Sequence, residues 1–505
     1  MSETPPSDSN PSGGPSPSGA AETTQFGSSV NDPISVKEKI GYGLGDTASN
    51  LYWKLFEYFQ LLFYTDVFGI SAAAAGTMFF VTKIWDAVND PLVGFISDRT
   101  KTAWGRFRPY LIWMSIPFAV TGMLTFYTPD FSPGGKLVYA YITYTLVFMA
   151  YTAINIPYGA LMGVISSNSL ERTSVSTYRF VLAFFGGLVV QKFTEPLIKF
   201  FGKSGTVMVD GVATDVINQQ AGFFWTVVCY ACAAVVLFTI TFLTTKERVL
   251  PDPKQKSTFS RDVADLIRNR PWIVLLFVGL FQILAGWTRG TATVYYFKYF
   301  VGSEFGNFLV AGTIASITGM FFTRRLVAFM GNKNLLILVM FVNSICMAGF
   351  FVLTKDQLGW MYTLHIVGSF ITGPMPILLW AMYADVADYS EWLNHRRATG
   401  LVFAAATFSQ KLGSALGAAV PGWTLATIGF VAPVEKQVEG TVTMVAQEQN
   451  PETISGIITM MSVLPAVFLF CGCIAMLFYN ISPKLMARIE TELVARKANG
   501  SSESE

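Results

Sequence analysis

The residues best suited to chemistry lie in one apolar segment, TKIWDAVNDPLVGF. Asp86, Asn89 and Asp90 occur at positions i, i+3 and i+4, so a helix would present all three on one face. Two carboxylates and an amide oxygen are hard oxygen ligands, which suit Na⁺ or a shared proton. The alternative is an internal ion pair with Lys83, three residues before Asp86. Because one lysine would neutralise only one carboxylate, we favour a cation site at Asp86 and Asp90.

The position of Asp86 within its segment adds to this argument. Asp86 lies 12 residues before Asp98, where the segment reaches a basic loop. In a helix this separation is about 18 Å, which would place Asp86 near the middle of a bilayer. A charge at that depth costs roughly 2.5–3.5 kcal/mol, so it needs a partner or a function.

A second polar group occurs in the segment MAYTAINIPYGALMG, where Thr152 and Asn155 precede Pro157. A proline frees a backbone carbonyl within a helix, and such openings are tolerated where they line a cavity. The alternative is that both polar side chains form hydrogen bonds across a helix interface. Position alone does not choose between a binding site and an interface.

Lone cations in apolar surroundings form a third group, which comprises Arg179, Arg289 and Lys411. A cation that faces an aqueous cavity can hold a hydroxyl-rich or anionic solute, or it can balance the carboxylates. Lys192 and Glu195 are expected to pair with each other, and so are Lys54 and Glu57, for which a substrate role stays open. His365 is solitary, and we interpret it as a packing residue.

The loop GFISDRTKTAWGRFRP places an acidic residue at a helix end before a tight basic turn. Such a loop can bridge to a neighbouring helix and hold one face of a transporter closed. The residues concerned are Gly94, Asp98, Arg106 and Arg108. The simpler interpretation is a loop whose positive charge only sets membrane orientation.

The composition indicates what kind of elements must position these residues. Charged residues make up 13% of the 505 residues and aromatic residues 15%, whereas soluble chains have about 25% charged residues. This is too little charge to cover a soluble surface. The net charge of +2 gives no indication of a nucleic-acid partner, and no motif pairs a nucleophile with a base or completes a metal site, so we expect no enzyme and no cofactor.

Apolar segments near the ~20 residues that span a bilayer recur along the chain. They predict an all-α membrane protein with twelve spans, at 41–68, 73–97, 110–128, 137–165, 174–200, 222–244, 272–298, 304–323, 334–354, 359–385, 398–430 and 454–480. The long charged connector divides them into two six-helix bundles. The predicted parts are a disordered tail (1–36), a first bundle (37–245), a connector (246–271), a second bundle (272–482) and a C-terminal tail (483–505).

Lysine and arginine concentrate in the loops on one side of these spans. That side holds the second loop and the connector, while the opposite loops contain little more than Lys136, Lys203, Lys355 and Lys436. Basic loops stay in the cytoplasm. Both termini and the connector are therefore predicted to be cytoplasmic.

At these motifs the chain resembles the major facilitator superfamily, and more narrowly its glycoside–pentoside–hexuronide:cation symporters, of which melibiose permease is the best known. The resemblance runs from about Lys37 to Lys484. It rests on SVKEKIGYGLGD, FYTDVFG, IWDAVNDPLVG, DRTKTAWGRFRP, YTAINIPYGAL, YRFVLA, TTKERV, YADVADYSEW and KLGSALGAA.

The resemblance implies roles for individual positions. The helix-two carboxylates of the family bind the coupling ion, which maps onto Asp86 and Asp90, with Asn89 and Thr152 as further ligands. The arginine of helix five contacts sugar, and the lysine of helix eleven lies close to both sites. The implied substrate residues are Asn50, Asn155, Tyr158, Arg179, Trp380 and Lys411.

Departures from the family pattern bear on the substrate. Melibiose permease has aspartates at the positions of Asn50 and Asn155 and a tryptophan at that of Gly159, which argues against an α-galactoside. Lys54 is unusual in the family and favours an acidic sugar such as a uronide.

The resemblance thus implies a monomeric secondary transporter in the plasma membrane. It would couple Na⁺ or H⁺ to symport of a pentoside, hexuronide or related glycoside by alternating access. Two alternatives are a lipid or lysophospholipid transporter of the same fold and a membrane sensor that transports nothing.

Overall fold

The computed structural model describes residues 33–166, 168–209, 212–249, 269–394, 399–438, 441–445, 447–482, 484–489 and 491–493. Most of the predicted N-terminal tail, of the connector and of the C-terminal tail lies outside these residues. The predicted domain boundaries in those segments therefore stay predictions.

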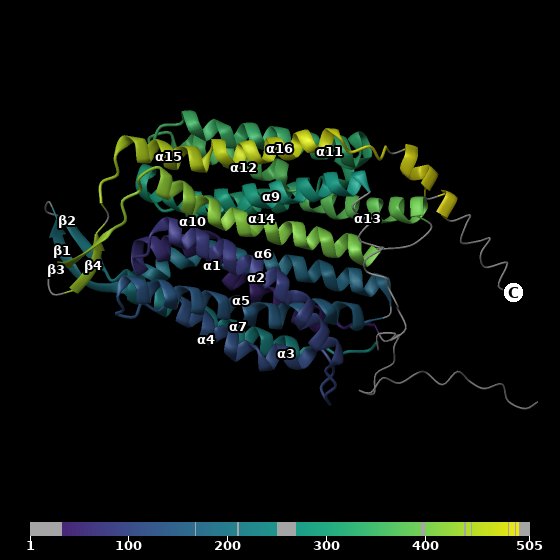
Figure 1. The fold of residues 1–505 in the computed structure, drawn as a ribbon, viewed down its shortest axis with the longest axis horizontal. Helices are drawn as coiled ribbons and strands as arrows, with labels where there is room; N and C mark the ends of the chain where they lie inside the picture. The colour runs from purple at the N-terminus through teal and green to yellow at the C-terminus, as the bar shows by residue number, and fades with distance from the viewer. Residues whose placement is uncertain are drawn as a thin grey trace, which may run out of the picture.

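Long, roughly aligned helices make up the described chain (Figure 1). The helices up to residue 244 are called here the first half. They are α1 (Val36–Leu62) with the π-turn η1 (Phe63–Phe68), α2 (Ala72–Arg99), α3 (Arg108–Trp113), α4 (Ser115–Thr125), α5 (Pro133–Val164), α6 (Ser169–Gly202) and α7 (Gln219–Thr244).

The second half begins at residue 270. It contains α9 (Arg270–Tyr296) with the π-turn η2 (Phe297–Val301), α10 (Gly306–Met320), α11 (Thr323–Ala348) with the 3-10 turn η3 (Gly349–Val352), α12 (Leu358–Thr372), α13 (Met375–Asn394), α14 (Thr399–Thr427), α15 (Pro451–Met461) and α16 (Val463–Leu477). Both halves start with a helix that ends in a π-turn and then a glycine with positive φ, Gly69 at 85° and Gly302 at 76°. A left-handed residue at this point favours glycine, so the same backbone requirement recurs in the two halves.

Two β-hairpins extend beyond one end of the bundle, called here the hairpin end (left in Figure 1). β1 (Lys203–Val209) pairs with β2 (Val212–Ile217), and β3 (Val434–Val438) pairs with β4 (Thr441–Val445). The all-α prediction missed both. Each hairpin follows the fifth predicted span of its half, so they occupy equivalent positions. Asp210 and Gly211 stand between the strands of the first hairpin, and an Asp-Gly dipeptide is a hairpin signal that could have found it. The second hairpin has Glu439 and Gly440 there, where the glycine alone is a weaker turn signal.

Seven described helical segments are long and apolar enough to cross a membrane by length and composition alone. α1, α2 and α14 are not among them. These helices contain the charged residues Lys54, Glu57, Asp86, Asp90 and Lys411, which lower their mean hydropathy. The count of twelve spans therefore stays a prediction.

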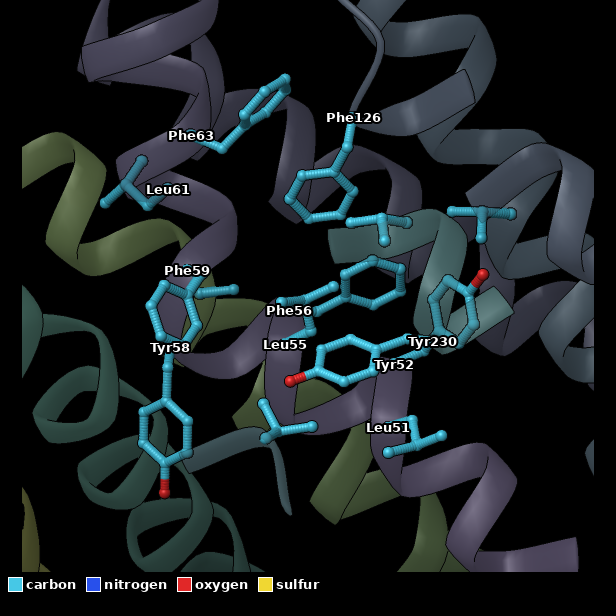
Figure 2. Packing of buried hydrophobic residues seen from close by; sticks show 14 of the residues in the cluster. Leu51, Tyr52, Leu55, Phe56, Tyr58, Phe59, Leu61, Phe63, Phe126 and Tyr230 are labelled. Carbon is cyan, nitrogen blue, oxygen red and sulfur yellow. The ribbon is translucent and has the colours of Figure 1, made fainter. Parts of the chain in front are cut away.

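Helix α1 lies in the interior of the first half. Figure 2 shows its aromatic side chains packed against residues of other helices. The rings of Phe63 and Phe126 lie 4.8 Å apart between centroids, and those of Phe56 and Phe126 lie 6.2 Å apart. Close packing of this kind fixes side-chain rotamers. The polar residues on the remaining face of α1 are therefore held in defined positions.

The two halves touch from the level of Asp86 up to the hairpin end. Helix α2 packs closely on α14: a methyl group at Gly76 would lie 2.7 Å from the carbonyl oxygen of Ala419. Lys298 on η2 forms an ion pair with Asp66 on η1 at 2.5 Å. The structure is thus closed at the hairpin end.

Candidate functional site

The predicted carboxylates of α2 face residues of two other helices. Asp86 is 7% exposed, and Thr152 of α5 donates a hydrogen bond to its Oδ1. Lys411 of α14 lies with Nζ 3.0 Å from Asp86 Oδ2, and it also contacts Asp90 Oδ2. The Thr152 hydroxyl lies 3.3 Å from Asp90 Oδ1. One ammonium group from the second half thus bridges two carboxylates of the first half.

Lys83 does not form the internal ion pair considered from the sequence. It is 4% exposed, and its ammonium lies 3.5 Å from the ring centroid of Trp287. The rings of Trp53 and Phe148 are also near, at 5.4 and 5.6 Å. The electron-rich ring faces stabilise the charge there. Lys411 is therefore the lysine that pairs with Asp86 and Asp90.

Asn89 is half-buried, and no hydrogen bond joins its side chain to another described residue. Its helical spacing from Asp86 and Asp90 was correctly inferred, since α2 is continuous through all three. Nothing in the described contacts brings its amide to the carboxylate oxygens.

Three of the six predicted substrate residues lie along the part of α1 between Asp46 and Asn50. Arg179 of α6 forms an ion pair with Asp46 of α1, with Nε 2.8 Å from Oδ2. Asn155 accepts a hydrogen bond from Ser49 at 3.1 Å. The Asn50 amide donates to the Asp46 carbonyl at 2.9 Å. The sequence reasoning missed Asp46, although a carboxylate inside an apolar helix was itself a signal.

Tyr158 and Trp380 make other contacts. The Tyr158 hydroxyl donates to the Tyr42 carbonyl at 2.7 Å, Tyr42 returns a bond at 3.0 Å, and the rings stack at 4.6 Å. This reciprocal pair fastens α1 to α5. Trp380 on α13 is 41% exposed and contacts Tyr383. Neither side chain is among those that line the central cavity described below.

A cavity of about 450 Å³, called here the central cavity, lies between the two halves. Its walls come from α1 and α6 of the first half and from α9, α10, α11 and α12 of the second. The polar residues of its lining include Asn50, Lys54, Glu57, Gln191, Arg289, Asn343 and His365. This volume is in the range of small-molecule sites.

Of the two side-chain pairs predicted within helices, one is confirmed and one is wrong. Lys54 pairs with Glu57 at 2.6 Å as predicted, and both line the central cavity. Lys192 instead donates to Asn307 of α10 at 2.5 Å, so its predicted pairing with Glu195 is wrong. His365 stacks on Phe308 at 3.8 Å, as expected of a packing residue, and it also lines the cavity.

The predicted gating loop is held by a residue that the sequence reasoning missed. Glu247, just after α7, accepts hydrogen bonds from the backbone N–H groups of Arg106, Phe107 and Arg108 at 2.8–2.9 Å. The Arg108 side chain donates to backbone carbonyls, among them that of Phe242 at 2.7 Å.

The other predicted gating residues make fewer contacts. No ion pair joins the exposed Asp98 to another described residue. The carbonyl of Gly94 accepts a hydrogen bond from Ser97 within α2. The sequence shows only that the TTKERV motif contains an acid, Glu247; its burial against the N–H groups of the loop is seen only in the structure.

Within the described residues, no three His, Cys, Asp or Glu side chains gather as a metal site would require. The carboxylates of Asp86 and Asp90, with the hydroxyl of Thr152, instead make a small set of oxygen donors. Such a set suits a monovalent cation or a proton, whose charge the Lys411 ammonium matches.

Residues 41–483 match the family described as MFS/sugar transport protein. The chain is 34% identical over 468 residues to the "Putative glycoside/cation symporter YagG" of Escherichia coli K12, which covers 92% of this chain and 96% of that protein. It is 32% identical over 481 residues to the isoprimeverose transporter of Lactiplantibacillus pentosus, covering 93% and 95%.

Solved structures share the fold. The inward open conformation of the xylose transporter XylE from E. coli superposes with a TM-score of 0.58 at 15% identity, over 90% of this chain and 98% of that chain. At this identity the likeness concerns the fold alone. Together with the family match, it confirms the predicted major facilitator fold.

Proposed function

This chain belongs to the MFS/sugar transport protein family, as its resemblance to glycoside–pentoside–hexuronide:cation symporters predicted, and we propose that it couples a cation gradient to uptake of a sugar or glycoside. It is a multi-pass membrane transporter and not an enzyme. The related glycoside/cation symporter and isoprimeverose transporter support this substrate class.

The observation that carries the proposal is the bridge from Lys411 to Asp86 and Asp90. The ammonium group occupies the place that a coupling cation would take between the carboxylates. A cation entering there would displace Lys411, because two positive centres repel each other and compete for the same carboxylate oxygens. Binding of the cation would therefore release a link between the two halves. Both Na⁺ and H⁺ fit this exchange.

Helices α1 and α9 place side chains both beside the carboxylates of Asp86 and Asp90 and in the lining of the central cavity. Trp53 of α1 and Trp287 of α9 enclose Lys83 beside the carboxylates, with their rings 5.1 Å apart. The same two helices place Lys54 and Arg289 in the lining of the cavity. A shift of either helix alters both sites at once. This shared support is the physical basis we propose for coupling, in which each ligand tightens the binding of the other.

We place the hairpin end outside the cell and both termini in the cytoplasm. The distribution of lysine and arginine supports this orientation. With this orientation, closure at the hairpin end would make the state inward-facing. We also propose that the protein is a monomer in the plasma membrane. Rocking of the two halves would expose the cavity alternately to each side.

Orientation can be tested with single cysteines in a variant whose five natural cysteines are replaced. A cysteine at Ser204 in β1 should react with an impermeant maleimide on intact cells. A cysteine at Thr102, in the loop after α2, should react only after the membrane is permeabilised. The reverse pattern would overturn the assignment.

The function itself is tested by uptake into proteoliposomes. The panel comprises xylosides, pentoses, hexuronides and galactosides, each under an imposed Na⁺ or H⁺ gradient. Accumulation of one sugar under one gradient is the expected result, and it identifies both partners. If no sugar of the panel accumulated under either gradient, sugar symport would be contradicted and the lipid alternative would be favoured.

A further inference from the structure

Arg289 differs from the neighbouring cations in how its charge is balanced. Lys54 pairs with Glu57, and Arg179 pairs with Asp46. Among the described residues, Arg289 has no carboxylate partner. Its Nη1 donates to the carbonyl of Met461 at 3.1 Å, and the guanidinium lies 4.6 Å from the Phe350 ring. A half-buried charge without a counter-ion is costly within the membrane, so it points to a function.

The lining of the central cavity does not neutralise the charge of Arg289. Glu57 is the one carboxylate among the lining residues that the structure describes, and Lys54 already neutralises it at 2.6 Å. Arg289 therefore leaves the cavity with a net positive charge. An anionic group that entered would meet a guanidinium whose planar N–H donors match a carboxylate.

A neutral polar group in the same wall also lacks a partner. No hydrogen bond joins the Asn343 side chain, which is 5% exposed, to another described residue. Buried polar groups are ordinarily satisfied, so a donor or acceptor from a ligand would complete it. Sugar hydroxyls can serve as either.

We propose that the central cavity is a subsite for a carboxylate-bearing sugar, with Arg289 as the carboxylate partner and Asn343 as a partner for hydroxyls. The inference rests on the proposed function and narrows its substrate class. It also assigns the preference for an acidic sugar to a different residue. Lys54 favoured a uronide from the sequence, but its ion pair with Glu57 leaves that role to Arg289.

The test uses two probes that differ at one carbon: p-nitrophenyl β-glucoside and p-nitrophenyl β-glucuronide. Each competes with uptake of the best sugar in proteoliposomes. The wild-type protein should bind the glucuronide more tightly. Arg289→Gln should weaken the glucuronide about tenfold or more, which is the scale of a hydrogen-bonded charge, and leave the glucoside within about twofold. Arg289→Lys should keep part of the preference.

Lys192→Gln is the matched control, since Lys192 is a cation of α6 that donates to Asn307 and is not part of the cavity lining. It should change neither probe. Equal weakening of both probes by Arg289→Gln would assign Arg289 a structural role and overturn the inference. The inference would also be overturned if the wild-type protein transported neutral glycosides and bound the glucoside more tightly than the glucuronide. The proposal of sugar symport would stand in that case. Absence of transport for every sugar would instead remove the proposed function.

Discussion

Lys411 and the carboxylates of α2 form a charge arrangement that a mobile cation can enter. The ammonium group is tethered to α14, whereas Asp86 and Asp90 belong to α2. When Lys411 contacts the carboxylates of Asp86 and Asp90, the two halves are linked at the depth of these residues. In the proposed function a free cation would replace the lysine there. This exchange would convert ion binding into a change in contact between the halves.

The prediction at this scale concerns Asp86→Asn. The amide keeps the shape of the side chain but removes the negative charge that holds either cation. Gradient-driven accumulation should fall until the sugar concentrations inside and outside are nearly equal, while some sugar exchange persists. Proteoliposome uptake with and without a gradient measures both.

Asp215→Asn, in the exposed hairpin strand β2, is the control for loss of one carboxylate. It should leave accumulation unchanged. Undiminished accumulation by the Asp86 variant would mean that the coupling ion binds elsewhere.

The loop between α2 and α3 is an element whose shape depends on one acid. Gly105 has φ = 112°, and a methyl group built there would lie 2.5 Å from Glu247 Oε1. Glycine thus lets the loop turn and lets the carboxylate approach three backbone N–H groups. The anchored loop keeps the ends of α2, α3 and α7 together.

Gly105→Ala should therefore destabilise the protein through two effects. The left-handed backbone conformation costs about 1–2 kcal/mol for alanine, and the collision with Glu247 adds about 1–3 kcal/mol. Gly69→Ala is the matched control, because Gly69 has φ = 85° with nothing within 4 Å of a methyl group. Thermal unfolding in detergent should show a larger fall in Tm for Gly105→Ala. Equal falls would show that the contact with Glu247 contributes nothing.

At the scale of the whole molecule, closure depends on small residues where α2 crosses α14. A methyl group at Gly76 would lie 2.7 Å from the Ala419 carbonyl, and one at Gly422 would lie 2.6 Å from the Ala72 carbonyl. Such close backbone approach is typical of small residues at helix interfaces in membranes. The ion pair between Asp66 and Lys298 stabilises the same end.

Gly76→Val should force α2 and α14 apart and shift the molecule away from the state closed at the hairpin end. Spin labels at Ser204 in β1 and Glu452 in α15 report on this end, one from each half. Their distance distribution should move to longer values in the variant. Gly163→Val on α5, where nothing lies within 4 Å of an added methyl group, should leave it unchanged. An unaltered distribution in the Gly76 variant would show that this contact does not control closure.

Short-range features could be predicted from the sequence because helical geometry fixes them. The ion pair of Lys54 with Glu57 follows from a spacing of three residues, and the common face of Asp86 and Asp90 follows from a spacing of four. Apolar segments and family motifs predicted the major facilitator fold, since the need to satisfy backbone hydrogen bonds in lipid leaves helices as the main solution for such segments.

Only the tertiary structure decided which distant groups meet. Asp86 is three residues from Lys83 but pairs with Lys411, whose place in the sequence is 325 residues away, because Lys83 is enclosed by aromatic rings from other helices. Packing decides in the same way that Glu247 anchors a loop. It also decides that Arg289, in a cavity shared by six helices, has no carboxylate partner among the described residues. Helical spacing fixes neighbours within a segment, whereas packing between segments fixes which charge remains for a ligand.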